Sequence, residues 1–182
     1  MRLPKTLLWV MNLLMIYLLM FTLFRLVMVV AFFPEGEEVV NIIPSFLLGL
    51  RFDLRWISLF LFPIVLASFY PVYSPFYSER NKKIWTWYLA LVTFIVVFFF
   101  AADFGCFSYN KTRLNASALN FAEDPGTSLM MMWESYPLVW MILGLVITVI
   151  ILRWLFWHTH IYVINKTDGL GIPYQRKWFV IA

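Results

Sequence analysis

Charged residues are scarce in this sequence. They make up 13% of its 182 residues, whereas hydrophobic residues make up 63% and aromatic residues 20%. Soluble globular proteins are about a quarter charged and about half apolar, so this composition excludes an ordinary soluble domain and indicates an integral membrane protein. The formal net charge of +4 is small and is spread over the connecting segments, which excludes a nucleic-acid-binding stripe.

Cysteine and histidine are also rare. The single cysteine, Cys106, excludes an internal disulfide and a cysteine-based zinc site. His158 and His160 are two residues apart, whereas helical histidines that share a metal are normally four apart, so we expect both at the membrane interface. The P-loop, G-x-S-x-G and metal-ligand patterns are absent from the sequence. We therefore expect neither catalytic residues nor a metal or other cofactor in this chain.

Four long apolar runs predict transmembrane helices, because about 20 residues span the hydrocarbon core of a bilayer. We place these helices at residues 7–33, 46–70, 84–102 and 138–157, with Asp103 closing the third, and the start of a fifth at about residue 176. The predicted fold is an all-α integral membrane domain over residues 1–182. The long connection after Asp103 is expected to contain short interfacial helices, one around Leu114–Ala122 and one around Met130–Trp133.

The distribution of lysine and arginine predicts the orientation of these helices. The N-terminal segment has Arg2 and Lys5, and the connection after the second helix has Arg80, Lys82 and Lys83. The first connection has three glutamates and no basic residue. By the positive-inside rule, we expect a cytoplasmic N-terminus and place the first and third connections outside the cell.

Several charged residues interrupt the apolar runs. In the predicted threading of the chain, they all lie at one level, near the outer boundary of the membrane. Charges within a bilayer are costly and often functional, so we regard this cluster as the candidate site. Two interpretations are open and compatible. Asp53 pairs with an arginine of a neighbouring helix while the other arginines reach outer head groups, or the arginines converge on the phosphate of an anionic lipid. The cluster comprises Arg25, Arg51, Asp53, Arg55, Asp103 and Arg113.

Three segments carry a resemblance to a known family. They are FLLGLRFDLRWIS from Phe46, ADFGCFSYNKTRLNASALNFAEDP from Ala102, and WESYPLVW from Trp133. With the helix order, they resemble the N-terminal transmembrane domain of the lipoteichoic acid synthase-like, sulfatase-type phosphoglycerol transferases. That resemblance implies a multi-pass protein of the bacterial cell membrane, with five membrane helices followed by an extracellular catalytic domain.

The resemblance also implies a function. The family transfers glycerol phosphate from phosphatidylglycerol, or related phospho groups, with a threonine nucleophile and a divalent metal such as manganese in the catalytic domain. That domain is absent here, so we expect a fragment or an isolated domain that anchors the enzyme and presents lipid head groups. The expected partners are membrane lipids, phosphatidylglycerol or another anionic phospholipid among them, and the missing extracellular domain, but not nucleic acid. The alternative is a stand-alone multipass protein, such as a small transporter subunit or an assembly partner.

Overall fold

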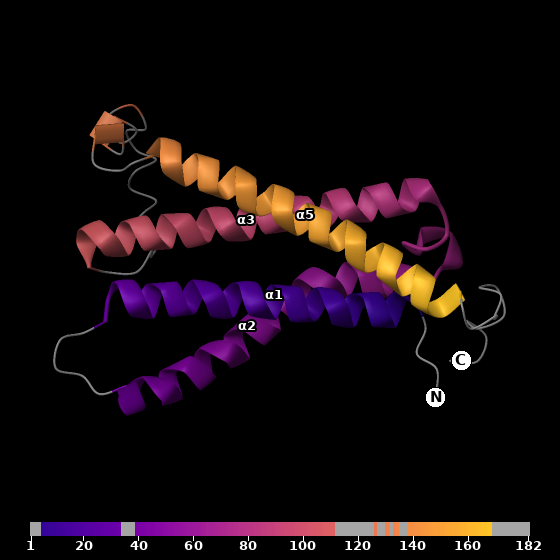
Figure 1. Cartoon of the computed structure of the whole chain (residues 1–182), viewed down its shortest axis with the longest axis horizontal. Helices are drawn as coiled ribbons and strands as arrows, with labels where there is room; N and C mark the ends of the chain where they lie inside the picture. The colour runs from indigo at the N-terminus through magenta and orange to yellow at the C-terminus, as the bar shows by residue number, and fades with distance from the viewer. Residues whose placement is uncertain are drawn as a thin grey trace. The chain divides into compact units, whose positions relative to one another are not determined.

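The computed structural model describes residues 5–33, 39–111 and 138–168, together with Gly126, Met130, Met131, Trp133 and Glu134. Within these residues the chain is helical and contains no strand (Figure 1). The long helices are α1 (Lys5–Ala31), α2 (Val39–Ser68), α3 (Glu79–Asn110) and α5 (Leu138–Asp168), and a short 3-10 turn, η1, covers Pro71–Tyr73.

Three of these helices, α1, α3 and α5, are long and apolar enough to cross a membrane. The helix α2 has 30 residues, but every stretch of 18 residues within it contains Arg51, Asp53 and Arg55. The all-helical membrane fold is therefore confirmed for three helices. That α2 is a fourth span stays a prediction, and the fifth helix, expected from about residue 176, lies outside the described residues.

Two predicted helix ends are wrong. The third helix does not close at Asp103 but runs to Asn110. No proline follows Asp103 within this stretch, and Gly105 costs a helix far less than proline does. The residue after its end, Lys111, has a left-handed φ of 55°, and its amide donates to the carbonyl of Phe107 at 3.0 Å. The last helix continues beyond residue 157 to Asp168, so polar residues that we placed after it are helical.

The second helix begins earlier than predicted, at Val39 rather than Phe46. Pro44 and Pro63 both lie inside it, and helices in bilayers tolerate proline when neighbouring groups satisfy the freed carbonyls. Arg55 therefore lies about 24 Å along the helix from its first residue, which is farther than the predicted start at Phe46 implied.

The chain divides into two compact units, Met1–Leu89 with Trp154–Ala182, and Ala90–Arg153. In the first unit, α1 and α2 lie side by side (Figure 1). One face of α1 is buried at a spacing of four residues, through Trp9, Leu13 and Tyr17. The Tyr17 hydroxyl donates to the carbonyl of Leu89 at 3.3 Å, so this apolar interior also contains a polar link to α3.

The second unit contains the later part of α3 and the first part of α5. Its described surface is strongly apolar, with exposed side chains such as Phe98, Trp140 and Ile150. Met130, Met131, Trp133 and Glu134 are helical and exposed, as expected for the second interfacial helix. The first interfacial helix, around residues 114–122, lies outside the described residues.

Candidate functional site

An ion pair joins α1 to α2. The Nη2 atom of Arg25 lies 2.6 Å from Oδ2 of Asp53, and the two side chains are 18% and 10% exposed. Nη1 of Arg25 donates to the carbonyl of Phe46 at 3.0 Å, and the guanidinium carbon lies 5.1 Å from the centre of the Phe46 ring. Asp53 thus pairs with an arginine of a neighbouring helix, as the structural interpretation of the cluster predicted.

Gly49 makes room for this arginine. It lies between Phe46 and Asp53 on α2, and a methyl group at this position would overlap the guanidinium of Arg25. The absence of a side chain therefore lets the guanidinium approach the α2 backbone and reach both the carbonyl and the carboxylate. Because Arg25 is a flexible side chain, its guanidinium can shift to make room for a methyl group, but only by weakening its contacts to the carbonyl of Phe46 and the carboxylate of Asp53.

Arg51 and Arg55 point away from the ion pair. Both are exposed, whereas Asp53 between them is 7% exposed, as expected for residues two apart on a helix. The guanidinium of Arg55 lies 5.7 Å from the centre of the exposed Phe52 ring. Arg51 has no hydrogen-bond or ion-pair partner among the described residues. The structure therefore separates Arg25 from this exposed pair, because the carboxylate of Asp53 holds it on the opposite face of α2.

The two remaining members of the predicted cluster do not belong to the described part of the first unit. Asp103 lies within α3, in the other compact unit, where it has an interaction of its own. Arg113 lies outside the described residues. The candidate site therefore comprises Arg25 and Asp53 as a buried pair, and Arg51 and Arg55 as an exposed pair.

A second polar cluster, which we did not predict, holds the segment between α2 and α3. The backbone carbonyls of four consecutive residues, Val72 to Pro75, accept hydrogen bonds from side chains of α3 and α5. Nδ2 of Asn81 donates to Val72 and Ser74, at 2.6 and 3.0 Å. Nε1 of Trp85 donates to Tyr73 at 2.9 Å, and Nε2 of His160 to Pro75 at 3.1 Å. We call Asn81, Trp85 and His160 the carbonyl clamp.

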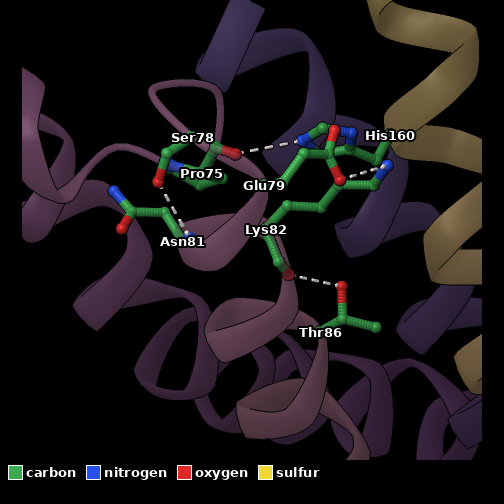
Figure 2. Close-up of polar contacts among 7 residues, drawn as sticks. All are labelled: Pro75, Ser78, Glu79, Asn81, Lys82, Thr86 and His160. Atoms are coloured by element: carbon green, nitrogen blue, oxygen red, sulfur yellow. Dashed lines mark hydrogen bonds and ion pairs between the residues drawn. The ribbon is translucent and has the colours of Figure 1, made fainter.

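Figure 2 shows the α5 side of this clamp, with the imidazole of His160 directed at the carbonyl of Pro75. A carbonyl oxygen only accepts, so Nε2 carries the proton. The ring is 2% exposed and stacks on Phe76 with centroids 4.4 Å apart, while Trp9 of α1 meets it edge-on at 5.5 Å. His160 is therefore buried inside the protein, whereas His158 is exposed. That both histidines lie at the level of the membrane interface stays a prediction.

A buried lysine lies beside this histidine. Nζ of Lys82 is 3.7 Å from the centre of the Trp157 ring and 3.4 Å from Oε2 of Glu79, and the residue is 7% exposed. Figure 2 shows Lys82 and Glu79 next to His160. The adjacent Lys83 is exposed. One face of α5 is buried at three- and four-residue spacing, through Leu152, Phe156, His160 and Val163. This spacing is the signal in the sequence for the cluster, but it can be recognised only if the helix is predicted to continue past residue 157.

The two clusters have different chemical abilities. Exposed arginines four residues apart share a helix face and suit the oxygens of a phosphate. The carbonyl clamp is neutral and fixes the backbone of a connecting segment. No group of three or more metal-ligating side chains occurs in the part of the chain that the structure describes. Comparison with protein-family models, curated proteins and solved structures finds no match to this chain.

Proposed function

We propose that this chain is a membrane-anchoring domain that presents anionic lipid head groups to a sulfatase-type phosphoglycerol or phospholipid head-group transferase of the bacterial cell envelope. The observation that carries the proposal is the exposed pair Arg51 and Arg55 on α2. These two guanidinium groups lie on one helix face, among exposed apolar side chains such as Phe52 and Trp56. A phospholipid has the matching chemistry, with an anionic phosphate above apolar acyl chains.

The proposal requires α2 to cross the membrane as a fourth span. The Arg25–Asp53 ion pair supports this, because pairing removes much of the penalty of placing these two charges within a bilayer. Arg25 lies about 9 Å from the end of α1 at Ala31, so the pair is close to one end of that helix. Arg51 and Arg55 flank Asp53 in the middle of α2, so the closeness of the pair to the end of α1 is what would let their long side chains reach the phosphates of the head-group layer.

The positive-inside rule supports an external location for this end of the unit, since the connection between α1 and α2 has glutamates and no basic residue. An external lipid phosphate is where an extracellular catalytic domain would need its substrate. The sequence resemblance to the lipoteichoic acid synthase-like transferases supports that enzyme class, and such an enzyme would need a divalent metal such as manganese in its catalytic domain.

Lipid binding by the purified protein tests the first part of the proposal. Native mass spectrometry would compare retained phosphatidylglycerol and phosphatidylcholine in the wild type and in Arg51→Ala/Arg55→Ala. Each basic side chain near an anionic surface contributes about 1 kcal/mol, so we expect about 25-fold weaker phosphatidylglycerol binding at this site in the double variant. Unchanged phosphatidylglycerol binding, in a variant that still inserts into membranes, would reject the site.

A fusion tests the second part. Joining the chain to a sulfatase-type catalytic domain should give transfer of glycerol phosphate from phosphatidylglycerol, and the Arg51→Ala/Arg55→Ala fusion should transfer more slowly at the same lipid concentration. Equal rates in the two fusions would show that these arginines do not present the lipid. Failure of several such fusions to transfer, with the free catalytic domain active, would favour a stand-alone membrane protein.

A further inference from the structure

The first turns of α3 carry a second exposed surface of basic and apolar side chains, at the opposite end of the first unit from Arg25. Arg80, Lys83, Ile84 and Trp87 are all exposed and lie at the spacing of one helix face. The same face continues with Leu91, which is 59% exposed. The opposite face of α3 is buried, with Lys82 at 7%, Thr86 at 2% and Leu89 at 0% exposure.

The order of residue types along this face matches the layers of a membrane. The two basic residues come first, Ile84 and Trp87 follow, and the apolar Leu91 comes last. Arg80 and Trp87 are separated by about 10 Å along the helix axis. The polar layer on each side of a bilayer is about 5–8 Å thick, so a Trp87 at the hydrocarbon boundary places the backbone of Arg80 just outside this layer, from where its long side chain can reach back to the phosphates.

The adjacent residues Lys82 and Lys83 differ in their surroundings, since Lys82 is buried and Lys83 is exposed. Lys82 is covered by the Trp157 ring and paired with Glu79, so its charge is used inside the protein. Lys83 and Arg80 have no hydrogen-bond or ion-pair partner among the described residues. Two cations without internal partners therefore remain on the face that the apolar residues direct toward lipid.

The backbone next to these cations is held in place. Ser78 caps the start of α3, since its hydroxyl accepts from the amide of Asn81 at 3.2 Å and its carbonyl accepts from the amide of Lys82 at 3.1 Å. The carbonyl clamp fixes the preceding segment, which exposes Tyr73 and Tyr77 with 63% and 54% of their surface accessible. Tyrosine side chains of this kind settle at the head-group level of bilayers.

We infer that Arg80 and Lys83 bind the phosphate groups of anionic phospholipids in the leaflet that borders the start of α3, with Trp87 inserted at the hydrocarbon boundary. The surface is preformed, because the clamp and the serine cap order the backbone without lipid. This inference is independent of the proposed function, since it concerns the other end of the unit and other residues.

Native mass spectrometry with matched variants tests the inference. Arg80→Gln/Lys83→Gln and Arg51→Ala/Arg55→Ala each remove two positive charges, so they change the total charge equally. In the Arg51→Ala/Arg55→Ala background we expect phosphatidylglycerol still to bind more tightly than phosphatidylcholine. Adding Arg80→Gln/Lys83→Gln should weaken phosphatidylglycerol binding about 25-fold, from about fivefold per basic residue, and leave phosphatidylcholine binding unchanged.

The exchanged variant Arg80→Lys/Lys83→Arg keeps both charges and should retain most of this binding, which separates charge from a change in folding. Phosphatidylglycerol binding that is unaffected by Arg80→Gln/Lys83→Gln would overturn the inference. Loss of binding with Arg80→Gln/Lys83→Gln but not with Arg51→Ala/Arg55→Ala would support the inference and reject the proposed site on α2. The converse result would reject the inference and leave the α2 site standing.

Discussion

The two ends of the first unit stabilise their polar groups in different ways. Near the end of α1, one ion pair of 2.6 Å between Arg25 and Asp53 links α1 to α2. Near its start, neutral side chains of the carbonyl clamp satisfy four backbone carbonyls, and aromatic rings enclose His160. The first end therefore depends on an ion pair between two helices, whereas the other combines several neutral hydrogen bonds with the Lys82–Glu79 ion pair inside α3.

This difference follows from what each end must accommodate. At the first end, α2 carries three charged side chains within a helix, and an unpaired carboxylate there would be costly to bury. At the other end, the chain must turn between α2 and α3, and the backbone carbonyls of its buried residues, Ser74 and Pro75, need donors. The comparison predicts large effects from single changes at the ion pair and smaller, local effects at the clamp.

The largest effect is expected from breaking the ion pair. Asp53→Leu leaves Arg25 without its carboxylate, and removal of one partner of a buried pair costs about 3 kcal/mol or more of unfolding free energy. Arg25→Leu should cost a similar amount, because it leaves the carboxylate unpaired. Unfolding measured in one detergent for both variants checks this.

The double variant Arg25→Leu/Asp53→Leu sharpens that test. Replacing a whole buried pair with apolar residues is often neutral, so the double variant should be more stable than either single variant. Additive losses would mean that the two residues act independently and that the ion pair does not join α1 to α2.

A smaller effect is expected at the clamp. His160→Phe preserves an aromatic ring against Phe76 but removes the donor to Pro75, which leaves a buried carbonyl unsatisfied at a cost of about 1–3 kcal/mol. Hydrogen exchange should increase mainly in residues 71–78. His158→Phe is the matched control, because His158 is exposed and should leave that exchange unchanged. Equal exchange in both variants would show that His160 does not hold the segment.

The smallest effect is expected at Gly49. Gly49→Ala gains helix propensity but displaces the guanidinium of Arg25, so we expect a net loss of about 1 kcal/mol in unfolding free energy. In the Arg25→Leu background the clash with the guanidinium is gone, and the same substitution should be neutral or stabilising. A loss of equal size in both backgrounds would place the role of Gly49 elsewhere.

The sequence predicted much of this architecture and missed the clamp. Apolar length was sufficient to locate α1, α3 and α5, because a run of about 20 apolar residues has few alternatives. Helix ends were less predictable: Asp103 does not stop α3, since a single aspartate within a helix costs far less than a proline. The similar depth of Arg25 and Asp53 was enough to suggest an ion pair. That Arg25 and Arg51 lie on opposite faces of α2 could be seen only once α1 and α2 were placed side by side.

His160 illustrates a different limit. Its spacing from His158 argued against a shared metal site, but spacing alone could not show that a carbonyl 85 residues earlier in the chain accepts a hydrogen bond from its ring. Contacts of this kind depend on which helices meet, and an isolated helical pattern contains no information about the partner.

The account depends on α2 crossing the membrane, and side-specific cysteine labelling tests this most directly. With Cys106 replaced by alanine, single cysteines at Phe33, after α1, and at Tyr73, after α2, would be treated with a membrane-impermeant thiol reagent in intact cells. The account predicts that the cysteine at residue 33 reacts from outside and that the one at residue 73 reacts only after the membrane is opened. Reaction of both cysteines from the same side would contradict it, because α2 would then not be a span.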